Sequence, residues 1–181
     1  MANTVSRAMH DTGLAAWFGG TLANAVALNP AAAEAGDASS TGRVANAGWD
    51  RWTPVNAAAI GVHLIGAVGQ LLSNKSRVAA QEGVGAMTVT KTALTAAALG
   101  ATAYSRVLGK KVSQHHDVPA ESGTSPASTT PDDVASAQKQ LALLQWLIPA
   151  LTGALVVTTS YAGEQQRATE VHKGIAARLM G

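Results

Sequence analysis

The chain alternates between long uncharged segments and shorter segments that carry its charges. Asp, Glu, Lys and Arg are absent from residues 12–33, 52–74 and 140–163, and a fourth segment, 83–105, contains Lys91 as its one charge. A helix needs about 20 mostly apolar residues to cross the hydrocarbon core of a bilayer, whereas a soluble helix has a charged outer face. The pattern therefore predicts four transmembrane helices, near residues 13–32, 55–73, 84–106 and 140–162.

Composition supports this interpretation and also leaves one alternative open. Charged residues make up 13% of the 181 residues, about half of what a typical soluble domain contains. Hydrophobic residues make up an ordinary 47%, and the apolar segments are rich in alanine and not in leucine. Small residues are typical of closely packed membrane helices. The alternative is an alanine-rich soluble bundle buried inside a large assembly.

The predicted fold class is all-α, a four-transmembrane-helix bundle with a short amphipathic C-terminal helix. The membrane domain would comprise residues 1–162, with a mobile loop over 107–138 that is rich in Ser, Thr, Pro and Gly. The tail, 163–181, repeats apolar residues every four positions, at Val171, Ile175 and Leu179, which is typical of a helix at a membrane surface. We interpret the first segment as a retained helix and not as a cleaved signal peptide.

The expected location is a cell membrane, namely a bacterial inner membrane, with both termini on the same side. Lys and Arg are divided evenly, six on each side of the predicted membrane, so the positive-inside rule does not fix the orientation. The short loop around residues 74–83 and the basic tail favour cytoplasmic termini. Trp49 and Trp52 precede the second predicted helix, where tryptophan commonly anchors a chain at the interface.

Polar residues fall at matched depths along the predicted helices. Counting 1.5 Å per residue from the ends nearest the termini, Asn24, His63, Thr95 and Thr152 all lie about 15–17 Å deep, near the midplane. Residues seven apart share a helix face, which adds Gln70 to the face of His63 and Gln145 to that of Thr152. Each helix thus has a polar stripe, and the natural place for four stripes is the interior of the bundle.

Two explanations of this polar seam remain. The residues hydrogen-bond between helices and fix their packing, or they line a pocket for a polar head group, a quinone or a haem. Interhelical hydrogen bonding is the commoner role of Thr and Asn, while an ionisable residue at the midplane marks a functional site. We therefore name one candidate ligand-binding set: His63, Asn24, Lys91, Thr95, Thr152, Gln70 and Gln145.

Lys91 is expected to reach back toward the nearer interface. It lies seven residues into its helix, about 10 Å deep, and helical side chains lean toward the N-terminus. Its ammonium group would therefore reach the level of Gln70 on the preceding helix. Such snorkelling makes the charge tolerable, and an inward Lys91 could instead bind an anionic head group.

Several classes of function are not indicated. A net charge of +2 without a basic stripe gives no reason to expect a nucleic-acid partner, and the absence of cysteine excludes disulfides and thiolate sites. Phosphate-loop, zinc-protease and serine-hydrolase motifs are absent. A haem held by two histidines is not expected, because His10 would lie at the surface, about 15 Å from the level of His63. No catalytic residue, metal site or particular cofactor is predicted.

The layout of four short helices, with "GLAAWFGG" in the first and a polar seam, resembles uncharacterised small membrane proteins of high-GC bacteria. In architecture alone it is also similar to the DoxX-like group, some of whose members are tied to quinone or redox chemistry. The resemblance rests on the arrangement of the four helices and carries over no catalytic residue.

The leading hypothesis is an accessory or scaffold subunit of a larger membrane assembly, with other membrane proteins, further copies of itself and lipid as its partners. The alternative is a DoxX-like redox or quinone- or lipid-binding membrane enzyme that uses the midplane polar site.

Overall fold

A computed structural model describes residues 2–114, 118–164, 167, 171–172 and 175–176 of the chain. Short connections join the first three of four long helical segments, and a longer connection that contains a two-stranded hairpin leads to the fourth. In chain order the elements are α1 (Ala2–Ala23), the π-helical turn η1 (Asn24–Leu28), α2 (Asn29–Ala32), the 3₁₀ turn η2 (Ala33–Ala35), α3 (Ala38–Ser73), α4 (Lys75–Ala80), α5 (Val84–Ser113), β1 (Ala120–Ser122), β2 (Ser125–Pro126) and α6 (Asp132–Glu164).

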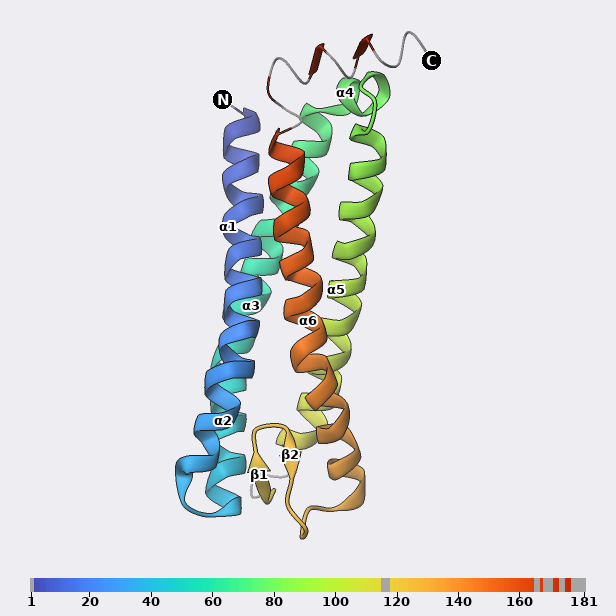
Figure 1. The fold of residues 1–181 in the computed structure, drawn as a ribbon. Helices are drawn as coiled ribbons and strands as arrows, with labels where there is room; N and C mark the ends of the chain where they lie inside the picture. Colours follow the sequence, from blue (N-terminus) through green and yellow to red (C-terminus); the bar gives the residue numbers. More distant parts are fainter. Residues whose placement is uncertain (1, 115–117, 165–166, 168–170, 173–174, 177–181) are drawn as a thin grey trace.

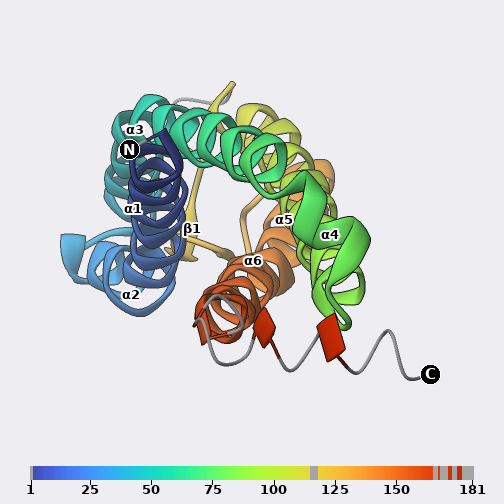
Figure 2. The same ribbon diagram turned by 90° about the horizontal axis from the view of Figure 1, so that it is seen from above.

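The four long segments form an antiparallel bundle made of two close pairs (Figure 1). Helix α1 packs along α3, and α5 packs along α6. The start of α1, the end of α6 and α4 lie at one end of the bundle, here called the terminal end. The strands β1 and β2 form a hairpin at the opposite end, here called the hairpin end. Viewed from the terminal end, the helices surround the bundle axis in the order α1, α3, α5 and α6 (Figure 2).

The prediction of an all-α fold is confirmed apart from the small hairpin, and the membrane prediction is supported in part. Among the described residues, two helices, α3 and α6, are long and apolar enough to cross a membrane. In each, 22% of the most apolar window is buried inside the structure, whereas a core helix of a soluble protein would be mostly buried. These two helices do not establish the number of spans.

The first predicted helix begins too late. The prediction placed its start near residue 13, whereas α1 begins at Ala2. No glycine or proline interrupts residues 2–12, and Arg7 and Asp11 form an i,i+4 ion pair of 3.7 Å that supports the early turns. The side chain of Ser6 also faces Gly69 of α3. Packing against α3 therefore holds this polar segment in a helix.

The loop predicted between residues 33 and 54 is mostly helix, because α3 begins at Ala38 and not near 55. Asp37 caps this helix, with Oδ1 accepting from the backbone amide of Ser40 at 2.9 Å. The Ser40 hydroxyl also donates to Asp37, and together these bonds hold the pKa of the carboxyl group below its ordinary value. The cap's contribution is therefore present at neutral pH and is lost as the pH falls through that lowered pKa. Pro54 lies inside α3.

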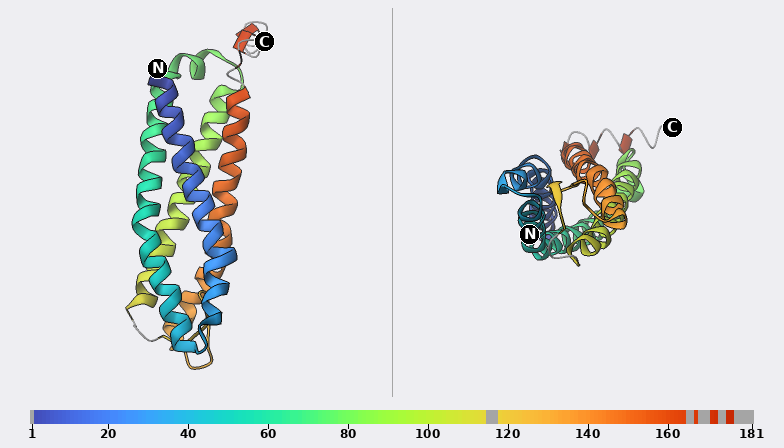
Figure 3. Two further views of the ribbon diagram at one scale, coloured as in Figure 1. Left: turned by 90° about the vertical axis from the view of Figure 1, so that its left-hand side faces the viewer. Right: turned by 90° about the horizontal axis from the view of Figure 1, so that it is seen from below.

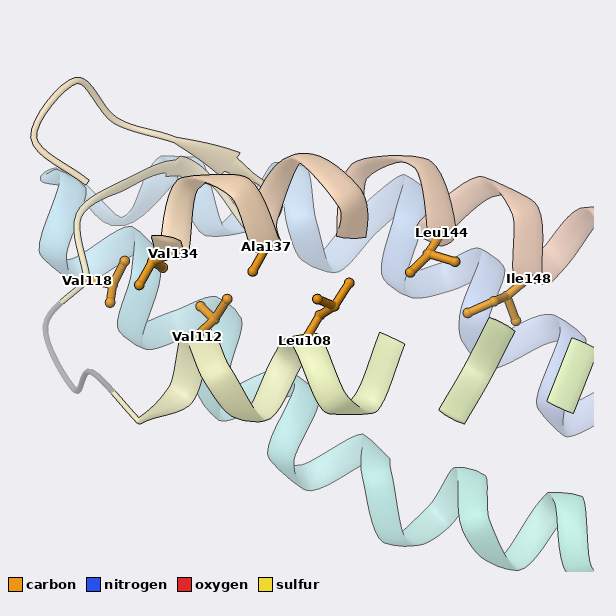
Figure 4. Close-up of a cluster of buried hydrophobic side chains, with 7 residues drawn as sticks. All are labelled: Leu108, Val112, Val118, Val134, Ala137, Leu144 and Ile148. Carbon is orange, nitrogen blue, oxygen red and sulfur yellow. The ribbon is translucent and has the colours of Figure 1, made fainter. Parts of the chain in front are cut away.

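The mobile loop predicted over residues 107–138 is much shorter, because α5 continues to Ser113 and α6 begins at Asp132. Both helices extend into the predicted loop because the last turns of α5 pack against the first turns of α6. A cluster of buried apolar side chains from α5, α6 and the segment before β1 fills this region (Figure 4). It consists of Leu108, Val112, Val118, Val134, Ala137, Leu144 and Ile148.

The hairpin lies across the end of the bundle, as the view from below shows (Figure 3). It docks where α3 has no side chain, since a methyl group at Gly42 would lie 2.1 Å from the carbonyl oxygen of Val118. The amide of Gly123 also donates to the carbonyl oxygen of Asn29, at 3.2 Å. The amphipathic helix predicted for the tail, 163–181, falls largely outside the described residues, with Leu179 among those not described.

Helices α1 and α3 touch backbone to backbone at two glycines. A methyl group at Gly13 would lie 2.5 Å from the carbonyl oxygen of Ala59, and one at Gly66 would lie 2.3 Å from the amide nitrogen of His10. Such distances leave no space for a β-carbon, and the atoms in the way are backbone atoms that cannot swing aside. Small residues allow this close approach in packed membrane helices, so α1 and α3 form the tightest seam of the bundle.

We expect Gly66→Ala to separate α1 from α3 and to lower the free energy of unfolding by about 1–3 kcal/mol, the usual cost of overpacking. The matched control is Gly61→Ala on the same helix, where nothing lies within 4 Å of the added methyl group. This control should be neutral or slightly stabilising, because alanine favours the helix. Unfolding in mixed detergent micelles measures both, and equal stability of the two variants would contradict the proposed seam.

Candidate functional site

The side of the bundle between α3 and α5 contains two cavities. Helix α3 lies against α1 along its length and makes few contacts with α5, so the space between α3 and α5 is incompletely filled. A cavity of about 400 Å³ lies toward the terminal end, and one of about 280 Å³ lies toward the hairpin end. We call them the terminal cavity and the hairpin cavity. Leu99 of α5 lines both, so the two cavities meet at this side chain.

The terminal cavity brings together three of the predicted site residues. Lys91, Thr95 and Gln70 all line it, so the two residues expected at one level, Lys91 and Gln70, share this cavity. Its other polar lining residues are His10, Asn74, Arg77, Thr88 and Thr92, and the remaining lining residues are apolar. Its described wall contains two cations, Lys91 and Arg77, and no carboxylate.

Two of these polar groups have bonding capacity left for a ligand. None of the ion pairs found among the described residues includes Lys91. The side-chain amide nitrogen of Gln70 is buried and has no hydrogen-bond partner in the described part of the chain. Thr95, by contrast, donates to the carbonyl oxygen of Lys91 at 2.8 Å, one turn earlier in its own helix. The terminal cavity thus combines apolar walls with an ammonium group and an amide donor.

The hairpin cavity contains a fourth predicted residue, Gln145, together with groups that the sequence analysis did not include. Its polar lining residues are Asn46, Trp49, Trp52, Thr53, Asn56, Thr102, Ser105, Arg106, Ser113, Thr124 and Gln145. Gly123 and Thr124 of the hairpin close it at that end. Arg106 pairs with Asp50, Nη1 to Oδ1, at 3.4 Å. The cation of this cavity therefore already has a carboxylate partner.

Asn29 organises one wall of the hairpin cavity. Its side-chain oxygen accepts from Nε1 of Trp49 at 2.9 Å, and its side-chain nitrogen donates to Oε1 of Gln145 at 2.8 Å. Asn29 is 2% exposed, and Gly123 packs against its side chain. This one residue therefore links α2, α3, α6 and the hairpin.

His63 belongs to the core and lines neither cavity. It is fully buried, its ring lies 4.3 Å from that of His10 and 6.0 Å from that of Trp17, measured between centroids. Its Nδ1 donates to the carbonyl oxygen of His10 at 3.1 Å, so Nε2 is an acceptor, and this atom has no partner among the described residues. The prediction that His10 lies about 15 Å from the level of His63 is wrong, because α1 begins 11 residues earlier than expected.

Asn24 and Thr152 also lie outside the cavities. Asn24 donates to the carbonyl oxygen of Gly20 at 2.8 Å, and Thr152 donates to that of Ile148 at 2.9 Å, both within their own helical segments. Their polar groups are therefore satisfied locally and do not point to a ligand.

The four matched depths do not hold in the structure. Trp17 marks the level of His63 by its ring contact, and its Nε1 donates to Thr102 of α5 at 3.3 Å. Both α1 and α5 run from the terminal end to the hairpin end. Asn24 lies seven residues after Trp17, toward the hairpin end, whereas Thr95 lies seven residues before Thr102, toward the terminal end. Asn24 and Thr95 are therefore about 20 Å apart in height. The predicted seam divides between two cavities and the core.

The sequence analysis missed Asn56, Trp52 and His10 as candidates. Asn56 continues the spacing of seven that relates His63 to Gln70, and that spacing could have identified it. Trp52 was assigned to a loop, and His10 to the surface, because the helix starts were placed too late.

No protein-family model, curated protein or solved structure matches this chain. The resemblance to DoxX-like and other small membrane proteins therefore stays a prediction.

We expect Asn29→Ala to destabilise the hairpin end. The substitution leaves Nε1 of Trp49 and Oε1 of Gln145 without their partner, and each lost buried bond costs about 1–3 kcal/mol. Limited proteolysis at residues 118–131 and thermal unfolding in detergent measure the effect. Asn46→Ala is the control, since no side-chain bond of Asn46 occurs among the described residues. Resistance to proteolysis equal to that of the control would contradict this role of Asn29.

Proposed function

We propose that the chain is an integral membrane protein whose four long helical segments all cross the bilayer. Large apolar side chains are exposed on each segment, with exposed fractions of 55% for Val26, 62% for Ile65, 63% for Val107 and 75% for Leu143. The uncharged part of α3, residues 52–73, is about 33 Å long, enough for a hydrocarbon core of about 30 Å. Lipid is the solvent that suits such a surface.

Within this arrangement, we propose that the protein binds an amphiphile with an anionic head group in the terminal cavity. The observation that carries the proposal is the ammonium group of Lys91, which lines the cavity beside apolar residues such as Leu64, Val68 and Leu71, where no carboxylate lines the wall among the described residues. A pocket that is mostly apolar with a few convergent polar groups is the usual form of a ligand site. An ammonium group at membrane depth also needs an anionic or polar partner.

The proposed ligand pose follows from the position of Lys91. This residue lies seven positions after Val84, the first residue of α5, so its α-carbon is about 10 Å below that helix end. Its side chain leans toward the terminal end, where Asn74 and Arg77 also line the cavity. Asn74 and Arg77 already bond to each other, with Nη1 of Arg77 donating to Oδ1 of Asn74 at 3.2 Å. An anionic head group would therefore lie against Lys91, with Gln70 donating a further hydrogen bond. The acyl chain would extend past Ala96 toward Leu99.

We expect Lys91→Met to weaken binding of oleate about tenfold or more, since a hydrogen bond to a charged group contributes about 1.5–3 kcal/mol. Methionine keeps the length and the apolar part of the side chain, so the cavity stays filled. Titration of detergent-solubilised protein with oleate, followed by native mass spectrometry, measures the affinity. The control is Lys110→Met, an exposed lysine of the same helix at the hairpin end.

Methyl oleate provides a second control, because it has the same chain without the negative charge. Unaltered protein should bind oleate more tightly than methyl oleate, and Lys91→Met should remove the difference. Equal binding of oleate by Lys91→Met and by unaltered protein would overturn the proposal, as would equal binding of the two ligands by unaltered protein.

An accessory role in a larger assembly is the second candidate, and one observation favours it. The ridge of small residues Thr92, Ala96 and Gly100 on α5 is exposed, and nothing lies within 4 Å of a methyl group placed on Gly100. Such ridges allow another membrane helix to approach closely. A second copy or another membrane protein could therefore pack against α5.

We expect Gly100→Leu to reduce association if this ridge is an interface, because the larger side chain blocks close approach of a helix. Native mass spectrometry of protein extracted gently from membranes measures the distribution of oligomers and complexes. Gly19→Leu on α1 is the control, since nothing lies within 4 Å there either. A monomer in both variants and in the unaltered protein would count against the accessory role.

A further inference from the structure

The hairpin cavity contains two buried polar atoms that no described residue satisfies. They are Nε1 of Trp52, which is a donor, and the side-chain oxygen of Asn56, which is an acceptor. Asn56 is 9% exposed. A buried polar group without a partner costs about 1–3 kcal/mol, so two of them at one cavity call for a physical explanation.

Several other polar residues that line the same cavity do have hydrogen-bond or ion-pair partners. Trp49 and Gln145 bond to Asn29, and Thr102 accepts from Trp17. Arg106 pairs with Asp50. These four lining residues therefore have partners, whereas the unsatisfied donor and acceptor lie at adjacent turns of α3.

Packing fixes the position of this pair. Trp52 and Asn56 are four residues apart, which places them on one face of α3 with β-carbons about 5–6 Å apart. The indole of Trp52 lies over Gly20 of α1, where a methyl group would be 1.8 Å from Cζ2 of the ring. The indole therefore rests directly on the backbone of α1 and has little freedom to turn. Donor and acceptor form a preorganised pair.

We propose that the hairpin cavity binds an uncharged acylglycerol, a lipid whose polar end has both an ester carbonyl group and a free hydroxyl group. The carbonyl oxygen accepts from Nε1 of Trp52, and the hydroxyl group donates to the side-chain oxygen of Asn56. The acyl chain extends along Ile60 toward Leu99. An uncharged ligand is favoured because Arg106, the one cation among the described lining residues, already has its carboxylate partner, and burial of a further charge is costly.

This site differs from the terminal cavity in charge and in position, and the proposal does not depend on the anionic ligand proposed there. The volume of about 280 Å³ lies just below the usual range of about 300–1,000 Å³ for ligand pockets. The cavity would therefore hold the polar end and part of the acyl chain of a monoacylglycerol. The hairpin closes one end through Gly123 and Thr124. The ligand would therefore enter from the side, between α3 and α5.

The test uses monoolein and methyl oleate, which share an ester carbonyl group and an acyl chain but differ in their hydroxyl groups. Titrations with each ligand, followed by native mass spectrometry of the full chain in detergent, give the affinities. Unaltered protein should bind monoolein about five- to tenfold more tightly than methyl oleate, the effect of one net hydrogen bond of about 1 kcal/mol. Asn56→Leu should weaken monoolein binding by that factor and leave methyl oleate unchanged.

Trp52→Phe should weaken binding of both ligands by a similar factor, because both have the carbonyl group that accepts from the indole. Lys91→Met should leave monoolein binding unchanged, which separates this site from the terminal cavity. Retained binding of methyl oleate in Asn56→Leu also shows that the variant is folded. An equal affinity of unaltered protein for the two ligands would overturn the proposal. So would equal losses for both ligands in Asn56→Leu.

Discussion

The backbone contact between α1 and α3 is the constraint on which the rest of the structure depends. Gly13 and Gly66 have no side chains, and the two helices approach until main-chain atoms touch. Because α3 packs mainly against α1, and α5 mainly against α6, α3 and α5 make few contacts with each other. The open side of the bundle is thus the consequence of two tight pairs, and both cavities lie there.

The two cavities differ because different elements complete them. Toward the terminal end, α4 and the start of α5 supply Arg77 and Lys91 to an otherwise apolar wall. Toward the hairpin end, Asn29 links α2, α3, α6 and the hairpin through bonds to Trp49 and Gln145, and Trp52 and Asn56 add an indole donor and an amide acceptor without partners among the described residues. The same groove is therefore cationic in one half and neutral in the other.

The sequence predicted the number and order of the long helices, because uncharged segments of bilayer length are visible without any structure. It also placed Lys91 and Gln70 at one level on neighbouring helices, and both line the terminal cavity. It misplaced the helix ends, because Asp37 caps a helix that starts 17 residues before the expected position, and because contacts such as that of Ser6 with Gly69 of α3 support the polar start of α1.

The relative heights of the helices could not be predicted from helix lengths alone. They depend on which glycine meets which turn of the partner helix, and that register brought His10 beside His63 and moved Asn24 away. The unsatisfied polar atoms of Trp52 and Asn56 could not be predicted from the sequence either, because whether a polar atom has a partner depends on side chains from other helices. Periodicity alone could have added Asn56 to the candidates.

The glycine contacts between α1 and α3 also determine which positions of the sequence can be substituted during evolution. At Gly13 and Gly66 any side chain meets main-chain atoms of the opposite helix, so neither neighbour can compensate by becoming smaller. Positions such as Ile65 and Leu143 face outward and can exchange among apolar residues with little effect on the fold. Related sequences would therefore differ at most surface positions and keep glycine at positions 13 and 66. These two glycines would identify the architecture better than any polar residue.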